Sequence, residues 1–243
     1  MGSRIHSPII YWRCGRMSVT NRLPINIDTS TFEATVGGTR SVVANQRFPT
    51  WNSGDGAFVV MTIGYGSEAF ESLLRRLKDV GINWVVDVRS RPHSKYRPEY
   101  SSAVLADKLR RDGIGYLFMG DQLGGRPDDP TCYDHLGHVR YDFIASKPAF
   151  VESLSRIETG TRHGYRIALL CSEARPEVCH RTKLIAENLR QRGVVAVRHI
   201  DPDGTICDHE TVIRRIDGGQ QSLGFDDTLI TSVGAYHHDG SRI

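Results

Sequence analysis

The segment "LLCSEARPEVCHR", residues 169–181, places two thiols, two carboxylates and three basic side chains directly after an apolar run. Cys179 falls near the first turn of a helix predicted for 179–192, where free N–H groups and the helix dipole favour anions. His180 and Arg181 add positive charge, which favours the thiolate form of a cysteine. The segment therefore predicts an anion pocket or a cysteine nucleophile. The alternative is a buried cysteine beside two solvated basic residues.

Two carboxylates are predicted to lie at strand ends. Glu173 follows the apolar run 165–171 by two residues, and Asp87 lies near the end of the run 82–88. Partial desolvation at a sheet edge suits a carboxylate to acid or base catalysis, or to stabilising a developing cation. For Asp87 the alternative is an ion pair with a nearby arginine, Arg89 or Arg181. The candidate catalytic residues are Asp87, Glu173 and Cys179.

The segment "RSRPHSKYRPEY", residues 89–100, alternates basic and aromatic side chains. Such a loop can neutralise successive phosphates while its rings stack on bases. A solvated basic loop is the alternative, because clustered charge alone is weak support for binding. We expect a nucleic acid or a nucleotide as the partner. The candidate substrate-binding residues are Gly64, Tyr65, Gly66, Arg89, Arg91, Lys95, Tyr96, Arg97, Gly124, Gly125, Cys171, His180 and Arg181.

Metal and cofactor sites are judged by spacing as well as by residue type. The competent ligands are Cys171, Cys179, His180, Cys207 and His209. Their spacings, C-x7-C-H and C-x-H, do not match a zinc knuckle, and the chain has no CxxC. The Gly-Tyr-Gly at 64–66 is too short for a dinucleotide fingerprint, and no Walker A motif is present. The sequence therefore predicts neither a metal nor a cofactor.

The elements that position these residues alternate between strand-length apolar runs and helical patterns. Phe70, Leu73, Leu74 and Leu77 have the spacing of one helical face, and further helices are expected near 101–113 and 148–157. Continuous apolar runs indicate parallel strands buried on both faces. The expected strands are 58–63, 82–88, 114–119, 165–171 and 194–200. The pattern predicts an α/β fold, a single three-layer domain with an approximately five-stranded, mainly parallel, Rossmann-like sheet. Ligands bind beyond the carboxyl ends of such strands, which is where the candidate residues gather.

The composition is that of a globular chain, with 39% hydrophobic and 24% charged residues. A net charge of +3 is too small to establish a polyanionic partner. Five scattered cysteines predict reduced thiols and a cytoplasmic location, and no apolar stretch approaches the roughly 20 residues of a membrane span. We expect a partly disordered extension at 1–56, the α/β domain at 57–216 and a poorly structured tail at 217–243.

Four motifs occur in a fixed order: "TIGYG", "VVDVRSRPHSKY", "DQLGG" and "LLCSEARPEVCHR". With them, residues of about 60–201 resemble the bacterial and archaeal family called domain of unknown function 488. The resemblance implies a compact α/β domain whose strand-end motifs form one pocket, and it names no activity. The family pattern maps onto Gly64, Tyr65, Gly66, Asp87, Arg89, Pro92, Leu123, Gly124, Gly125, Cys171, Glu173, Cys179, His180 and Arg181.

The leading functional hypothesis is hydrolysis of an N-glycosidic bond in a nucleic acid or nucleotide, as in base excision by a DNA glycosylase. A flipped base would rest against Tyr65, and Glu173 or Asp87 would activate water or stabilise the developing cation. One alternative is sulfur or phosphate transfer with Cys171 or Cys179 as the nucleophile, although the loop lacks the C-x5-R phosphate cradle. The other is a non-catalytic module that binds nucleic acid or nucleotide.

Overall fold

The computed structural model describes residues 58–216 and 231–236. By its internal contacts the chain divides into Met1–Gln46 and Arg47–Ile243, and every described residue belongs to the second unit. The extension expected at 1–56 lies outside the described residues.

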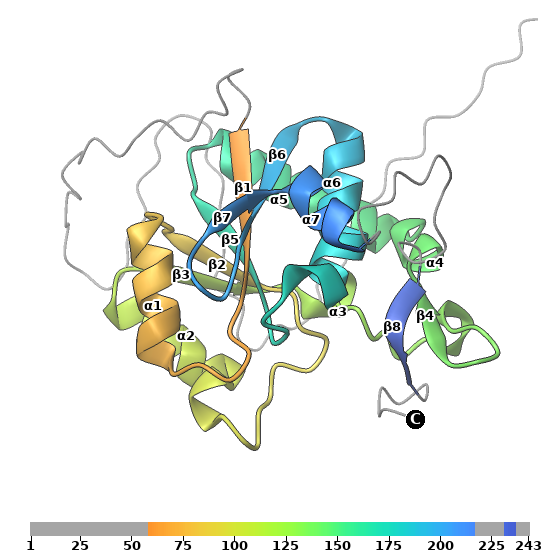
Figure 1. The fold of residues 1–243 in the computed structure, drawn as a ribbon, viewed down its shortest axis with the longest axis horizontal. Helices are drawn as coiled ribbons and strands as arrows, with labels where there is room; N and C mark the ends of the chain where they lie inside the picture. The colour runs from red at the N-terminus through yellow and green to blue at the C-terminus, as the bar shows by residue number, and fades with distance from the viewer. Residues whose placement is uncertain (1–57, 217–230, 237–243) are drawn as a thin grey trace, which may run out of the picture. The chain divides into compact units, whose positions relative to one another are not determined.

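A six-stranded sheet in the order β3-β2-β5-β1-β6-β7 forms the centre of the described unit (Figure 1). Its strands are β1 (Phe58–Gly64), β2 (Trp84–Asp87), β3 (Gly115–Phe118), β5 (Ile167–Cys171), β6 (Val195–Ile200) and β7 (Ile206–Asp208). The first five are parallel, and β7 runs antiparallel to β6 at one edge. The predicted α/β fold with a mainly parallel sheet is confirmed. The short edge strand β7 was not predicted.

Helices cover both faces of the sheet. Alternating strand residues point to opposite faces: Val59 and Met61 of β1 belong to one hydrophobic cluster, and Val60 belongs to the other. The first cluster includes α1 (Phe70–Asp79) and α2 (Ser102–Arg111), and the second includes α5 (Pro148–Arg162), η4 (Arg181–Ala186) and α6 (Glu187–Arg192). The remaining helices and helical turns are η1 (Pro98–Tyr100), α3 (Gly120–Leu123), η2 (Pro130–Cys132), α4 (Tyr141–Ala145), η3 (Pro176–Val178) and α7 (His209–Ile216). None of the helices in 58–216 is both long enough and apolar enough to cross a membrane.

A second, two-stranded sheet pairs β4 (His138–Arg140) with β8 (Thr231–Ala235) in antiparallel orientation. The hydroxyl of Ser232 accepts a hydrogen bond from the Val139 amide at 2.9 Å, and the Tyr236 amide donates to the Gly137 carbonyl at 2.7 Å. The sequence predicted a poorly structured tail at 217–243, but residues 231–235 of this tail form the strand β8. Figure 1 places β8 beside β4 and α4.

A chain of buried hydrogen bonds joins β1, β6, α7 and α6. Nδ1 of His199 lies 2.8 Å from the Thr62 hydroxyl, and its Nε2 lies 3.0 Å from Nδ1 of His209. Nε2 of His209 lies 3.0 Å from the Glu187 carboxylate, which can only accept when it is ionised. Thus His209 donates to Glu187, His199 donates to His209, and Thr62 donates to His199. This order requires a neutral His199.

Acidification is expected to destabilise the protein through His199. Burial, His209, Arg181 and Arg215 hold the pKa of His199 well below its usual 6.5, while Glu187, Thr62 and Thr182 are the other polar groups at the network. Below that usual value the unfolded chain takes up a proton that the folded chain does not, so the free energy of unfolding falls as the pH falls. Between pH 7 and pH 5 the loss is at most about 2 kcal/mol. Urea unfolding of wild type and His199→Gln at both pH values measures it.

The His199→Gln variant keeps one donor and one acceptor, and its stability should change less over this pH range. His135→Gln, which replaces an exposed histidine, is the control and should keep the wild-type pH dependence. Equal pH dependence in wild type and His199→Gln would contradict the prediction.

Candidate active site

A cavity of about 120 Å³ lies at the carboxyl ends of β2 and β5. Five parts of the chain line it: residues 89–91, 125–126, 171–173 and 178–180, and residues 232–234 of β8; Tyr141 and Tyr236 complete the wall. The carboxyl ends of adjacent parallel strands are the expected place for a ligand site. The cavity therefore joins loops that follow two strands to a wall formed by the C-terminal part of the chain.

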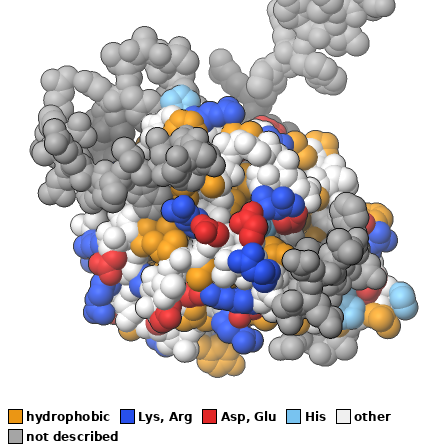
Figure 2. Space-filling model, turned by 45° about the horizontal axis from the view of Figure 1, so that its top comes forward, with side chains coloured by type: hydrophobic (Ala, Val, Ile, Leu, Met, Phe, Trp, Pro, Cys, Tyr) orange, Lys and Arg blue, Asp and Glu red, His pale blue; other side chains and the backbone are white. Residues whose placement is uncertain are grey.

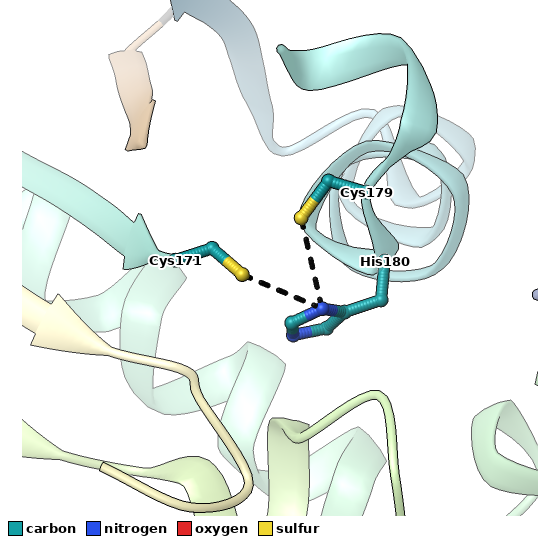
Figure 3. Close-up of side chains that lie close together, drawn as sticks. All are labelled: Cys171, Cys179 and His180. Atoms are coloured by element: carbon teal, nitrogen blue, oxygen red, sulfur yellow. Dashed lines mark hydrogen bonds between the residues drawn. The ribbon is translucent and has the colours of Figure 1, made fainter. Parts of the chain in front are cut away.

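Two thiols and one imidazole converge at this cavity. Sγ of Cys171, at the end of β5, lies 3.8 Å from Nδ1 of His180, and Sγ of Cys179 lies 3.7 Å from the same nitrogen. Figure 3 shows the three side chains pointing toward one another from the strand and from the start of the helical segment. The structure thus brings together three of the candidate residues, Cys171, Cys179 and His180.

The orientation of the His180 ring follows from its other nitrogen. Nε2 lies 3.0 Å from the carbonyl oxygen of Val88, which can only accept, so Nε2 carries the hydrogen. In the neutral ring Nδ1 then has its lone pair free, and this lone pair faces both sulfur atoms. The ring is thus held by the carbonyl of Val88, which follows β2, while His180 itself directly precedes η4.

The two thiols differ in acidity. The pKa of Cys171 lies well below its usual value, because the hydrogen bond from Cys179 and the nearby His180 and Arg181 outweigh the effect of burial. Burial and the neighbouring Cys171 raise the pKa of Cys179. Sequence reasoning selected Cys179 as catalytic and Cys171 as a binding residue; the structure makes Cys171 the more acidic thiol.

The predicted helix at 179–192 begins later and is partly π-helical. Cys179 has an extended backbone, with φ −114° and ψ 143°, and its carbonyl accepts from the amides of Thr182 and Lys183. The π-helical turn η4 follows and leads into α6. Such turns are frequent at functional sites because they redirect side chains that a regular helix would place elsewhere.

Arg181 is a fully buried cation beside the cysteines. Its Nη2 donates to the carbonyl of Ala174 at 2.8 Å, and its Nη1 donates to the carbonyl of Glu173. Within 58–216 and 231–236 no carboxylate forms an ion pair with its guanidinium. A buried charge without an opposite partner is costly, so the site favours an anion such as a thiolate near Arg181.

Asp87 lies at the end of β2 but is fully buried and does not line the cavity. Its Oδ1 accepts from Nε of Arg89 at 2.8 Å, and its Oδ2 accepts from Nη2 of Arg89 at 2.6 Å and from the Tyr116 hydroxyl at 2.7 Å. Of the two readings left open by the sequence, this geometry corresponds to the ion pair with Arg89.

Tyr65 is also largely enclosed. Its ring stacks on Tyr100 with centroids 3.8 Å apart, and its hydroxyl accepts from Nη1 of Arg89 at 3.1 Å. The stacked face is therefore occupied by a ring of the protein itself, and a nucleobase has no access to it.

The four glycines of the candidate site allow close packing. A Cβ on Gly64 would overlap the backbone of the turn after β5, and a Cβ on Gly125 would overlap the ring of His180. Gly66 has φ +52°, and Gly124 packs against the backbone near Ser90. Gly125 thus lets the imidazole lie against the main chain, where it reaches both thiols.

The exposed candidate residues divide into two groups. Glu173 is exposed and lines the cavity, as does Arg91. The exposed Lys95 and Tyr96 do not line it, and neither does Arg97, which is half-buried; Tyr96 is 96% exposed. The basic loop therefore extends from the cavity into solvent, with Arg91 at its cavity end.

Sequence reasoning missed several cavity residues. Arg126 lies over the ring of Tyr236 at 4.1 Å and donates to its hydroxyl at 3.1 Å. Tyr141, the first residue of α4, is buried in the wall, and this burial raises its pKa well above the usual value. These residues belong to short elements without a periodic hydrophobic pattern. In the sequence, only their residue types, arginine and tyrosine, could have indicated a role in binding.

The comparisons with known proteins bear on the same region. The model of the family described as "Domain of unknown function DUF488" matches residues 69–189, about half of the chain, and this match includes Asp87, Cys171, Cys179 and His180. No curated protein and no solved structure matches the chain.

Proposed function

This chain belongs to the family described as Domain of unknown function DUF488, and we propose that it is a cysteine-dependent enzyme that transforms a small anionic substrate. The observation that carries the proposal is the convergence of two thiols and one imidazole nitrogen at a cavity. A thiolate is the form of cysteine that attacks electrophiles or binds metal ions. Arg181 supports that form here, because it is buried and no carboxylate of the described residues pairs with it.

The proposed substrate carries a phosphate or a similar anionic group, as a nucleotide does. Arg91 and Arg126 line the cavity, where Glu173 is the one carboxylate among the described lining residues. The volume of about 120 Å³ is smaller than the roughly 300–1,000 Å³ of pockets that enclose drug-sized ligands. We therefore expect the reacting group of the substrate to enter the cavity while the rest lies along residues 91–97.

A long polyanion receives less support than a small one. On the face drawn in Figure 2, Lys and Arg side chains lie beside Asp and Glu side chains, so both signs of charge are interspersed there. The formal net charge of the chain is +3. We therefore expect a nucleotide rather than a nucleic acid as the substrate, and oligonucleotides are tested separately.

Hydrolysis of an N-glycosidic bond is a second candidate, favoured by the exposed carboxylate of Glu173 at the cavity. In that reaction Glu173 would activate water or stabilise the oxocarbenium ion. Asp87 would only position Arg89, because both of its oxygens are already hydrogen bonded. The two candidate functions therefore require different side chains: the cysteine-dependent reaction requires Cys171, and N-glycosidic hydrolysis requires Glu173.

The test incubates the full chain with nucleotides, phosphorylated and sulfur-containing metabolite-sized compounds, and intact or modified oligonucleotides, and detects products by mass spectrometry. Wild type is compared with Cys171→Ser and Glu173→Gln. Cys207→Ser is the matched control, because Cys207 is a thiol outside the cavity that donates to Asp201 at 3.2 Å, and serine keeps a donor there.

We expect Cys171→Ser to lower turnover by at least about 100-fold and Cys207→Ser to leave it unchanged. Loss of turnover in Glu173→Gln with full turnover in Cys171→Ser would replace the proposal with carboxylate-driven hydrolysis. Binding of a nucleotide without any turnover would support the non-catalytic module instead.

A further inference from the structure

We propose that Sγ of Cys171, Sγ of Cys179 and Nδ1 of His180 bind one Zn²⁺ ion and leave its fourth position open to the cavity. This inference deepens the proposed function, since it assigns a metal to the same three residues. The three donor atoms all lie within 4.8 Å of one another. They come from the end of β5 and from the start of the segment that leads into α6, on either side of the turn 172–178.

The spacing of the donors is close to that of a tetrahedral site. Zinc bonds of about 2.3 Å to sulfur and about 2.05 Å to nitrogen place each sulfur about 3.6 Å from the nitrogen in a tetrahedron. The distances from Nδ1 of His180 are 3.8 Å to Cys171 and 3.7 Å to Cys179. Both sulfur-to-nitrogen distances therefore lie within about 0.2 Å of the tetrahedral value, and the third pair, the two sulfurs, lies within 4.8 Å.

The surroundings of His180 are those of a metal ligand. A ligating histidine almost always donates its other N–H to a carboxylate, carbonyl or water, which fixes the ring and its tautomer. Nε2 of His180 lies 3.0 Å from the Val88 carbonyl, and this leaves Nδ1 as the donor that faces both sulfurs. Gly125 allows the ring to reach that position.

The charges at the site also suit a metal ion. Two thiolates balance the charge of Zn²⁺, and binding releases to solvent any proton that either thiol still carries. Thiolate and imidazole donors select zinc over magnesium or calcium. The nearby Arg181 favours the thiolates that such a site needs, and its own hydrogen bonds hold the turn between the two cysteines.

The open fourth position distinguishes this site from a structural one. Structural zinc sites have four protein ligands, whereas catalytic sites have three and keep one position for water or substrate. Among the described residues the group contains three donors, and all three line the cavity together with Glu173. A zinc-bound water at that position would be a hydrolytic nucleophile, and Glu173 would take its proton. A zinc ion held by two cysteines and one histidine, with a separate glutamate, is the arrangement of nucleobase deaminases, so nitrogen heterocycles of nucleotides form the first substrate class to examine.

The sequence predicted no metal site, because the C-x7-C-H spacing of Cys171, Cys179 and His180 does not fit a zinc knuckle. In a knuckle one short loop supplies paired cysteines. Here a strand end and a helical segment supply one cysteine each, and the distance along the chain is set by the turn between them.

The experiment uses the full chain, purified with a phosphine reductant and without added metal. Elemental analysis is expected to give one zinc ion per chain. After removal of zinc, titration with Co²⁺ is expected to give thiolate-to-cobalt charge-transfer bands and the visible bands of a tetrahedral site. Cys171→Ser, Cys179→Ser and His180→Gln should each reduce Co²⁺ affinity by more than the about 10–100-fold that loss of a second-shell partner costs.

Two control variants address other ligands of the chain. Cys207→Ser removes a cysteine that has a histidine two residues away, His209, and His237→Ala/His238→Ala removes the histidine pair near the C-terminus. Both should retain the full cobalt spectrum. Circular dichroism checks the folding of each variant, and the wild-type spectrum alone tests thiolate ligation if a ligand variant does not fold.

Absence of stoichiometric zinc together with a cobalt spectrum that lacks thiolate bands would overturn the inference. Metal binding that survives all three ligand variants but not the histidine-pair variant would overturn it as well. Zinc bound by wild type without turnover of any compound supports the metal site and counts against the proposed function. Turnover that needs Cys171 in fully metal-free protein supports a thiolate nucleophile and counts against the metal.

Discussion

Asp87→Asn is expected to lower the free energy of unfolding by about 3–5 kcal/mol. The substitution leaves the buried guanidinium of Arg89 without its counter-charge, and it replaces an acceptor of three side-chain hydrogen bonds with an amide. Both side chains are almost inaccessible, at 0% for Asp87 and 5% for Arg89, so water cannot take over these interactions. Denaturant unfolding monitored by circular dichroism measures the change.

The control is Asp208→Asn, which removes the exposed ion pair with Arg198 and should cost less than about 1 kcal/mol. A double variant, Asp87→Asn with Arg89→Met, should recover part of the loss, because it no longer leaves a buried charge unpaired. A cost for Asp87→Asn as small as that of Asp208→Asn would show that the Asp87 carboxylate does not hold the fold together.

Gly64→Ala is expected to destabilise the protein by at least about 3 kcal/mol, at the upper end of overpacking costs. The new methyl group would overlap the carbonyl oxygen of Glu173 and approach Nη1 of Arg181. The closest atoms belong to the backbone of Glu173, which cannot move without the turn, and the Arg181 guanidinium is held by its hydrogen bonds to the carbonyls of Glu173 and Ala174. The turn between the two cysteines must therefore shift, and we expect the cobalt spectrum of the site to change as well. Thermal and denaturant unfolding give the loss of stability.

Gly160→Ala is the matched control for this substitution. Gly160 lies inside α5, where the nearest side-chain atom, Cδ1 of Ile167, is 3.2 Å from the position of a Cβ. Alanine favours a helix interior over glycine by roughly 0.5–1 kcal/mol, which offsets the small shift that the Ile167 side chain must make. Gly160→Ala should therefore change the free energy of unfolding by less than about 1 kcal/mol. If Gly64→Ala behaved in the same way, β1 and the turn after β5 would not be in the contact described above.

Most of the sheet was predictable because its strands are buried on both faces. Runs such as "FVVMTI" and "YRIALLC" are continuous apolar segments, and their spacing by helices requires parallel pairing. β4, β7 and β8 were not predicted, because three to five residues in a partly exposed ribbon leave no such run. The pairing of β8 with β4 joins residues about 90 positions apart, so no pattern within a short stretch of sequence could predict it.

The sequence predicted that the candidate residues lie at strand ends, but it did not predict the role of each residue. The convergence of Cys171 with Cys179 and His180 follows from a parallel strand and its next helical segment meeting at one edge. The enclosure of Asp87 depends on Tyr116 of β3 and on the direction of the Arg89 side chain, which strand order alone does not determine. Tyr141 and β8 reach the cavity through tertiary packing.

The position of β1 has a consequence for the synthesis of the protein. β1 is the first described strand of the chain, yet it lies inside the sheet between β5 and β6. Its partners in β6 reach Ile200, so its second edge stays open until the ribosome has made nearly the whole domain. Pairings over such long sequence separations slow folding and expose strand edges. A nascent chain of this protein is therefore expected to need protection by chaperones until β6 has emerged from the ribosome.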